Sequence, residues 1–311
     1  MLTIVQFPHG GMEFPCNNDN WLDREKKITK WNAGPHCRRL VRHQGEYVNK
    51  LGASASTELA FWTEWEANTM VAELPRQYPN DRFVARWVHT VLRPNPDYAQ
   101  PNYTCRHAVQ NQERTQCPAA QFNGGTNTDP CVFGSTFKYC LCRQNAAQHI
   151  LKHLDRGSLI VFGSTIDGLF CLDTVFVVDE RKEYKTTSES IEGLGVSEEY
   201  RNLTLNRFIG FDGAFYRGAT VSNNINGMYS FVPARILQDD GQSFRRRCAL
   251  NVSEINKLNS GKEMFNPRST QAIKSTEIAT RQDLAKAVWD EICRQVFDQG
   301  FVLGTHFGWP V

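Results

Sequence analysis

The chain lacks an excess of charge of either sign. Its 311 residues contain 35 Lys and Arg against 33 Asp and Glu, a formal net charge of +2. Because the excess is so small, contact with the phosphates of a nucleic acid must depend on local basic patches. The sequence also lacks an apolar run of membrane-span length and a secretory signal at its start. We therefore expect a cytoplasmic protein with no membrane partner.

Motifs that mark several large enzyme classes are missing as well. There is no Walker loop, no Rossmann glycine fingerprint after the first predicted strand, no Gly-x-Ser-x-Gly elbow and no His-Glu-x-x-His. These absences disfavour ATPases, dehydrogenases, α/β-hydrolases and zinc proteases. The zinc deaminase signature is also absent.

Cysteine is plentiful, but its spacing is not that of a zinc site. Ten cysteines are present and no two stand in a Cys-x-x-Cys pair. Without an export signal we expect reduced thiols, many of them core residues. We predict no metal and no cofactor. A metal site stays open for six clustered residues: Cys105, His107, Cys117, Cys131, Cys140 and Cys142.

Apolar periodicity predicts three elements near the start of the chain. Residues 2–7 predict a strand that ends at Pro8. The basic stretch 36–43 predicts a helix. Residues 57–66 predict a strand with alternating faces, on which we expect Glu64 to be solvated.

The middle of the chain predicts a helix, a turn and a hairpin. Residues 144–154 have the pattern of a short helix, and Asp155-Arg156-Gly157 is a turn. Residues 158–163 and 169–178 are apolar strands joined through Thr165-Ile166-Asp167-Gly168, which is a hairpin signal.

A long amphipathic helix is predicted near the end. Thr280 to Asp283 resembles a capping box with Asp in place of Glu, and Gly300 is a stop signal. The apolar residues that repeat every four positions are Leu284, Val288, Ile292 and Val296.

The segment from the Asp-Pro loop to the second apolar strand resembles the PUA-like superfamily, which includes EVE and ASCH domains. It is also similar to the nucleotide-modification-associated domains found beside phage and bacterial DNA-modification genes. The resemblance implies a curled sheet that recognises a modified base, often one extruded from its stack. The residues that carry it are Asp129, Pro130, Phe133, Gln144, Gln148, His149, Gly157, Ile160, Phe162 and Gly163.

We therefore predict an α+β protein that is one elaborated domain over 1–311. Its centre, at about 120–235, would be a PUA-like curled mixed or antiparallel sheet, a partial barrel with flanking helices. Residues 1–119 would form an N-terminal elaboration, and residues 275–311 a C-terminal segment with the amphipathic helix.

Two segments are candidates for chemistry on a nucleobase. Asp129 precedes a proline, which favours an extended backbone and a projecting carboxylate, and Asn127 lies beside it. Trp62 offers a stacking surface for an extruded base, and Glu66 follows on the same predicted strand. A carboxylate there can stabilise positive charge on a sugar or orient water. A turn-forming Asp and a core Trp are the structural alternatives.

The stretch from His9 to Glu13 is a further candidate. Gly10 and Gly11 let the backbone approach a ligand closely, and free amides there can bind a phosphate. His9 and Glu13 are candidates for proton transfer. A plain Gly-Gly turn is the alternative.

Basic residues that could hold DNA phosphates gather at 36–43. They are His36, Arg38, Arg39 and Arg42. On a helix the three arginines would lie within one turn of each other. A solvated face balanced by acids is the alternative.

These candidates favour a DNA-binding hydrolase that acts by base flipping: a DNA glycosylase for a modified base. The PUA-like resemblance implies an antiviral role for it. Trp62 or Phe133 would stack on the base, and Asn127 or Gln144 would read its edge. DNA with modified bases is then the partner. A reader of modified bases without catalysis remains an alternative, as does an enzyme acting on a free nucleotide or NAD-like ligand. Asp173, in the middle of a predicted strand, is expected to be a structurally paired acid or a pocket residue.

Overall fold

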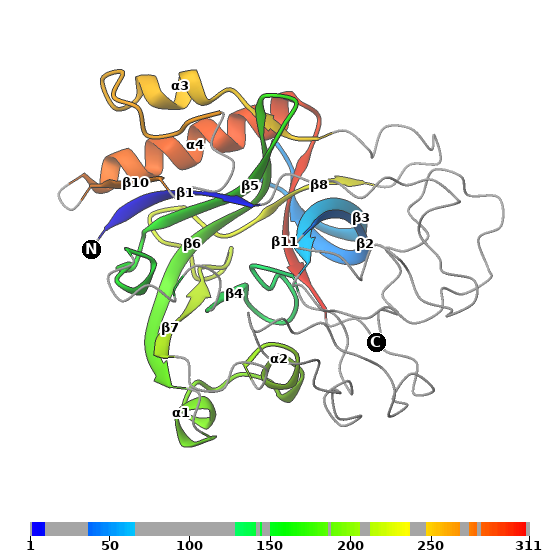
Figure 1. Ribbon diagram of the computed structural model, residues 1–311. Helices are drawn as coiled ribbons and strands as arrows, with labels where there is room; N and C mark the ends of the chain where they lie inside the picture. The colour runs from blue at the N-terminus through cyan, green and yellow to red at the C-terminus, as the bar shows by residue number, and fades with distance from the viewer. Residues whose placement is uncertain are drawn as a thin grey trace, which may run out of the picture.

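A computed structural model of the chain shows a protein made mostly of β-strands with a few helices. The structure describes residues 2–9, 37–65, 128–140, 144, 150–185, 188–205, 212–236, 247–267, 274–278 and 281–308. Its strands form a mixed sheet and a closed four-stranded barrel (Figure 1). This agrees with the predicted α+β class at the level of its secondary structure.

The mixed sheet has seven described strands, six of them in the order β10-β1-β5-β6-β7-β4, and β9 pairs with β6. Only β1 and β5 run parallel to each other, and the remaining pairs are antiparallel. In chain order the strands are β1 (Thr3–His9), β4 (Lys138–Tyr139), β5 (Leu159–Ile166), β6 (Leu169–Lys185), β7 (Asp212–Gly218), β9 (Ala249–Leu250) and β10 (Lys274–Glu277).

The barrel is assembled from strands that are distant in the sequence. It closes in the order β11-β2-β3-β8, and each strand is antiparallel to its neighbours. Its members are β2 (Cys37–Val48), β3 (Ser54–Trp65), β8 (Val232–Ile236) and β11 (Val302–Phe307). The segment predicted to curl, at about 120–235, therefore contributes mainly to the mixed sheet and gives the barrel only part of β8.

The helices lie outside the sheets, and α3 and α4 lie together along one side of the mixed sheet (Figure 1). They are α1 (Ser188–Glu192), α2 (Glu198–Leu203), α3 (Val252–Lys257) and α4 (Gln282–Asp298), with a single 3₁₀ turn, η4 (Ile150–Lys152). None of the described helices is long and apolar enough to cross a membrane.

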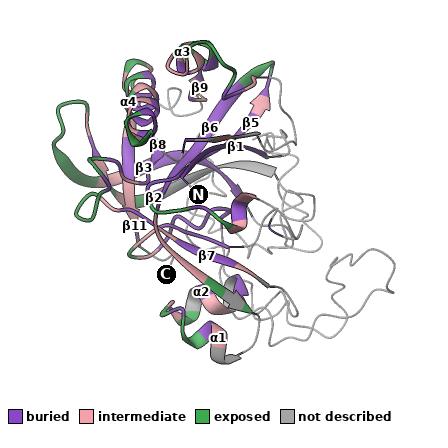
Figure 2. Cartoon of the chain, turned by 90° about the vertical axis from the view of Figure 1, so that its left-hand side faces the viewer, coloured by how far each residue is buried: buried purple, intermediate pink, exposed green. Residues whose placement is uncertain are grey.

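Two apolar cores lie on opposite faces of the mixed sheet. One contains Leu159 and Val161 of β5 together with the inner face of α4. The other contains Ile160 and Phe162 of β5 together with the barrel residues around Trp62. Because neighbouring residues of β5 enter different cores, the strand is buried on both faces (Figure 2).

Several predicted elements are confirmed. The β5–β6 hairpin turns at Asp167 and Gly168, whose φ values of 52° and 77° are those of a type I′ turn. The 155–157 turn ends at Gly157 with φ 88°. In α4 all four apolar residues of the predicted repeat are buried, and Gly300 takes φ 77° just after it.

Four predictions are wrong in detail. Of the stretch predicted as a helix over 36–43, residues 37–43 lie in β2, because twelve consecutive positions of β2 pair with β3 and this outweighs local helix preference. Strand β1 continues through Pro8 to His9. Beyond Gln6 it has one described neighbour, β5, so the missing proline N–H is tolerated.

The other two corrections concern helices. Of the helix predicted over 144–154, the structure describes only η4 as helical, and residues 145–149 lie outside the described residues. The N-cap of α4 is Arg281, which forms no side-chain capping hydrogen bond. The predicted capping box is therefore not what starts this helix, and burial of its apolar face is the stabilising factor that remains.

Candidate functional site

Two segments that the sequence marks separately meet at the end of β3. The backbone N–H of Asp129 donates a hydrogen bond to the carbonyl of Glu64 at 3.0 Å. Glu64 lies two positions beyond Trp62 on β3 and two before Glu66, which lies outside the described residues. The Asp-Pro turn and the Trp/Glu strand therefore form one unit.

Both carboxyl groups at this junction are buried. Glu64 is 2% exposed and Asp129 is 5% exposed. The expectation that Glu64 is solvated is therefore wrong, because β3 is covered on both faces from Leu59 to Glu64. Trp62 is 7% exposed and belongs to the same core as Phe162. A buried carboxyl group is costly unless it is bonded or has a chemical role.

The turn that carries Asp129 is fixed by its own side chains. The Thr128 hydroxyl donates to the Pro130 carbonyl at 2.7 Å and accepts from the Val132 N–H at 3.2 Å. Cys131 and Lys138 then exchange two backbone hydrogen bonds of 2.8 Å. The Lys138 ammonium donates to the carbonyls of Phe133 and Thr136, and burial lowers its pKa. Asp129 is thus held on a rigid loop.

A β-bulge in β6 places more polar groups on the same core. Phe162 pairs with Thr174, but Gly163 pairs with Leu172, so Asp173 is an extra residue on β6. A Cβ atom on Gly163 would lie 2.3 Å from the Cys171 carbonyl oxygen, so only glycine permits this close approach. The bulge therefore depends on Gly163.

The polar side chains beside the bulge are deeply buried. Ser164 is 1% exposed, Asp173 1% and Thr174 0%. The hydroxyl oxygens of Ser164 and Thr174 form no hydrogen bond with any residue that the structure describes. The prediction that Asp173 is a buried acid on a strand is confirmed. The sequence pattern did not predict a special role for the hydroxyls of Ser164 and Thr174.

The junction and the bulge lie on neighbouring parts of the fold. Val175 of β6 exchanges two backbone hydrogen bonds of 2.9 Å with Phe231, the residue before β8. Strand β8 is antiparallel to β3. As β8 is followed back toward Phe231, β3 runs forward toward Glu64, so the end of β3 is directed at the bulged part of β6. Both regions border the core that contains Trp62 and Phe162.

Two predicted base-contacting residues have structural partners. The Gln144 side chain donates to the Ala214 carbonyl at 2.9 Å and accepts from the Ala214 N–H at 2.8 Å. Phe133 is 1% exposed and its ring lies 5.4 Å from the His43 ring. Gln144 and Phe133 therefore have partners within the fold and are not part of the proposed site.

The other predicted site residues either lie on described strands, where their backbone pairing is known, or lie outside the described residues. His9 is the last residue of β1 and pairs in register with Ser164. Arg38, Arg39 and Arg42 lie on β2 opposite Glu64, Thr63 and Ala60, so the basic patch follows a strand and does not wind around a helix. Besides Glu66, five predicted site residues lie outside the described residues: Gly10, Gly11, Glu13, His36 and Asn127.

Metal ligands do not gather in the part of the chain that the structure describes. No three His, Cys, Asp or Glu side chains there are placed to hold an ion. Of the six clustered candidates, Cys131 and Cys140 are described, and both are buried and form no disulfide. The Cys140 thiol lies 3.0 Å from the Tyr200 hydroxyl. The other four lie outside the described residues.

Comparison with protein-family models, with curated proteins and with solved structures finds no match.

Proposed function

We propose that this chain acts on a modified nucleobase extruded from DNA and hydrolyses its N-glycosidic bond. The observation that carries the proposal is the backbone hydrogen bond from Asp129 to Glu64, which joins two segments whose carboxyl groups and Trp62 side chain are buried. The PUA-like resemblance of the segment that begins at Asp129 adds to the proposal a role in defence against phages with modified DNA.

Hydrolysis of an N-glycosidic bond needs two kinds of help. The C1′–N bond breaks as positive charge develops on the sugar, water supplies the new C1′–OH, and the base leaves with a proton. In the proposal the Asp129 carboxylate stabilises the sugar cation and orients the water. The carboxyl group of Glu64 supplies the proton that the base takes with it, and the Trp62 indole stacks on the base.

Arginines of strand β2 would bind the DNA phosphates beside this unit. Because β2 pairs with β3 along its length, Arg38 is in register with Glu64 and Arg42 with Ala60. Arginines on this strand would contact phosphates on either side of the extruded nucleotide. Contacts of this kind position the strand without reading its sequence, so affinity should fall steeply with salt.

The test is base release from DNA of differing base chemistry. Purified protein is incubated with genomic DNA from phages that carry different modified bases, and free bases and alkali-labile sites are measured. We expect release from one class of modified DNA. Asp129→Asn and Glu64→Gln should each lower the rate by about 100-fold or more, the usual range for a charge-stabilising or proton-transferring group.

A control variant separates chemistry from folding. Asp290→Asn changes an exposed acid on α4, on the far side of the sheet, and should leave the rate unchanged. If Asp129→Asn and Glu64→Gln abolish release but keep DNA binding and thermal stability, the carboxyl groups are catalytic. Binding to modified DNA without release by the unaltered protein would instead make the chain a reader. Turnover of free nucleotides, unaffected by loss of Arg38 and Arg39, would make it a nucleotide enzyme.

A further inference from the structure

Two buried hydroxyls stand out from the others in this fold. Ser164 and Thr174 are at most 1% exposed, and neither hydroxyl oxygen has a hydrogen-bond partner within the described ranges. A buried polar group without a partner costs about 1–3 kcal/mol. Such a group therefore needs a specific explanation.

Three other buried hydroxyls, which lie next to the strands of the fold, are bonded. The Ser158 hydroxyl accepts from the Thr3 N–H at 3.0 Å. The Ser230 hydroxyl accepts from the Val177 N–H at 3.0 Å and donates to the Val177 carbonyl at 3.4 Å. Thr128 is bonded on both sides of its oxygen. Among the described residues, Ser164 and Thr174 are thus the buried hydroxyls without a hydrogen-bond partner.

The two exceptions share one face of the sheet. Thr174 lies directly opposite Phe162, and Ser164 lies two residues beyond Phe162 on the same strand. Residues two apart on a strand point to the same side, so both hydroxyls lie on the face of the Phe162 ring. Asp173 is the residue that the bulge inserts beside Thr174. Ser164 lies three positions before Asp167 of the exposed Asp167-Gly168 turn.

We propose that Ser164, Thr174 and Asp173 form the subsite that reads the hydrogen-bonding edge of the nucleobase, an inference that rests on the proposed function. Each hydroxyl has one donor and two acceptor positions, and a carboxylate offers about four acceptor positions. This combination fits an edge with both N–H donors and carbonyl or ring-nitrogen acceptors. The flat Phe162 and Trp62 rings of the adjoining core fit the face of the same ligand.

Position on the fold supports the assignment. The end of β3, with Glu64 and the Asp129 turn, is directed at the part of β6 that pairs with Phe231, one residue beyond Thr174. The carboxyl groups proposed for chemistry and the hydroxyls proposed for recognition thus border one core. An edge-reading site must lie close to the bond that breaks, and the strand pairing of β3, β8 and β6 is consistent with that requirement.

The test uses two nearly isosteric substitutions, Thr174→Val and Ser164→Ala, which remove the hydroxyls and keep the apolar packing. In the ligand-free protein both should leave the melting temperature unchanged or raise it, because an unsatisfied buried group is removed. The same variants should lower kcat/KM for base release about 10-fold each, the usual effect of losing one hydrogen bond to a ligand. Ser230→Ala is the matched control, since its hydroxyl is bonded within the protein, and it should lower stability instead.

The outcomes separate this inference from the proposed function. If the unaltered protein releases a base and the double variant does so at the same kcat/KM, the subsite is overturned and the function stands. If no DNA yields a base, the function is overturned, and melting of the unaltered protein with free nucleosides then tests the subsite alone. A nucleoside that raises the melting temperature of the unaltered protein, but not of the double variant, supports the subsite. The absence of any nucleoside effect overturns it.

Discussion

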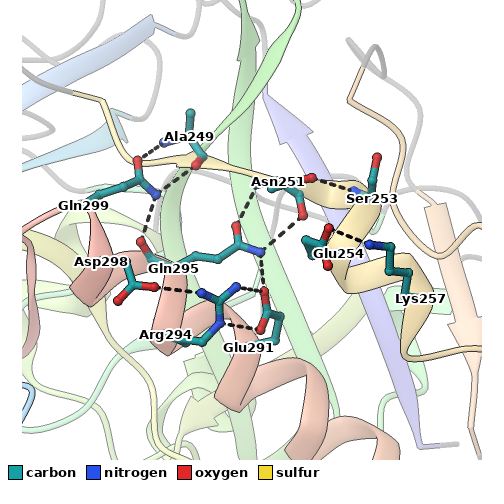
Figure 3. A network of polar contacts seen from close by, with 10 residues as sticks. All are labelled: Ala249, Asn251, Ser253, Glu254, Lys257, Glu291, Arg294, Gln295, Asp298 and Gln299. Carbon is teal, nitrogen blue, oxygen red and sulfur yellow. Dashed lines mark hydrogen bonds and ion pairs between the residues drawn. The ribbon is translucent and has the colours of Figure 1, made fainter.

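Gln295 of α4 and Asn251 exchange two hydrogen bonds through a side-chain amide and a backbone peptide unit. The Asn251 N–H donates to Gln295 Oε1 at 2.7 Å, and Gln295 Nε2 donates to the Asn251 carbonyl at 3.2 Å. One helical turn later, Gln299 does the same with Ala249, at 3.1 and 3.0 Å (Figure 3). The side-chain amides of these two glutamines thus form the hydrogen bonds with the 249–251 backbone that a neighbouring strand would otherwise form.

Loss of this amide should destabilise the protein. Gln295→Met keeps the volume of the 6%-exposed side chain but leaves the N–H and carbonyl of Asn251 without their partner. We expect a loss of about 1–3 kcal/mol of unfolding free energy, measured by denaturant titration. Lys257→Ala removes an exposed ion pair of α3 and should change stability by less than about 0.5 kcal/mol. Equal effects of the two variants would contradict the assignment.

The sequence predicts those elements of the fold that depend on residues close together along the chain. The β5–β6 hairpin and the α4 face follow from turn residues and spacing, and both are confirmed. Strand β2 was missed because its pairing with β3 is a tertiary effect, and four-residue spacing of arginines also fits a helix.

The site was predicted in part for the same reason. Asp129 and Trp62 were marked by local chemistry, but their connection through Glu64 is a contact between residues 65 positions apart. The bulge at Asp173 depends on a one-residue shift in the register with β5. A spacing argument assumes regular alternation, so it cannot place Thr174 on the same face as Ser164.

A second prediction concerns the Tyr216 hydroxyl of β7. It donates to the Leu151 carbonyl at 2.7 Å and accepts from the Leu154 N–H at 3.1 Å, which ties η4 to the sheet. Tyr216→Phe should cost about 1–3 kcal/mol, because both backbone groups lose their partner. Chemical denaturation at neutral pH measures this loss.

The buried Tyr216 hydroxyl also predicts that the free energy of unfolding falls at alkaline pH. Burial raises the pKa of Tyr216 from 10.0 to about 12. The unfolded chain loses this proton first, so the stabilising contribution is present below pH 10 and is lost as the pH rises toward 12. Tyr216→Phe should make stability less dependent on pH in that window. An unchanged slope between pH 10 and 12 would contradict the burial of this hydroxyl.

The third prediction is an acid effect centred on His43 in the barrel. Its ring lies 5.4 Å from the Phe133 ring and 6.3 Å from the Phe307 ring, and Nδ1 lies 2.6 Å from the Gln44 carbonyl. Burial is the largest influence and lowers the pKa of His43 below 6.5, while the Gln44 bond and the charge of Glu58 act in the opposite direction.

The lowered pKa of His43 predicts that the folded protein loses stability at acidic pH. Below pH 6.5 the unfolded chain takes up a proton more readily than the folded one, so stability is lost as the pH falls below that value. His43→Leu should reduce the difference in unfolding free energy between pH 7.5 and pH 5.5, measured by denaturant titration at both. If the variant and the unaltered protein lose the same amount over this interval, His43 is not the source of the acid sensitivity.

The fourth prediction compares two glycines of the β5–β6 hairpin. Gly168 has φ 77°, but no heavy atom lies within 4 Å of a Cβ built there. Gly168→Ala should therefore cost only about 1 kcal/mol for its backbone conformation. At Gly163 a Cβ would lie 2.3 Å from the Cys171 carbonyl and 2.7 Å from the Phe170 ring, so the strands must separate.

Gly163→Ala should consequently cost more than Gly168→Ala, about 2–4 kcal/mol, because overpacking moves the backbone itself. The shift would fall on the bulge that holds Asp173 and Thr174, so base release should drop as well, even at a temperature where the variant is fully folded. Gly168→Ala lies at the exposed turn and should keep both rate and specificity. Comparable stabilities for the two variants would mean that the strands are not as close at Gly163 as the register shift requires.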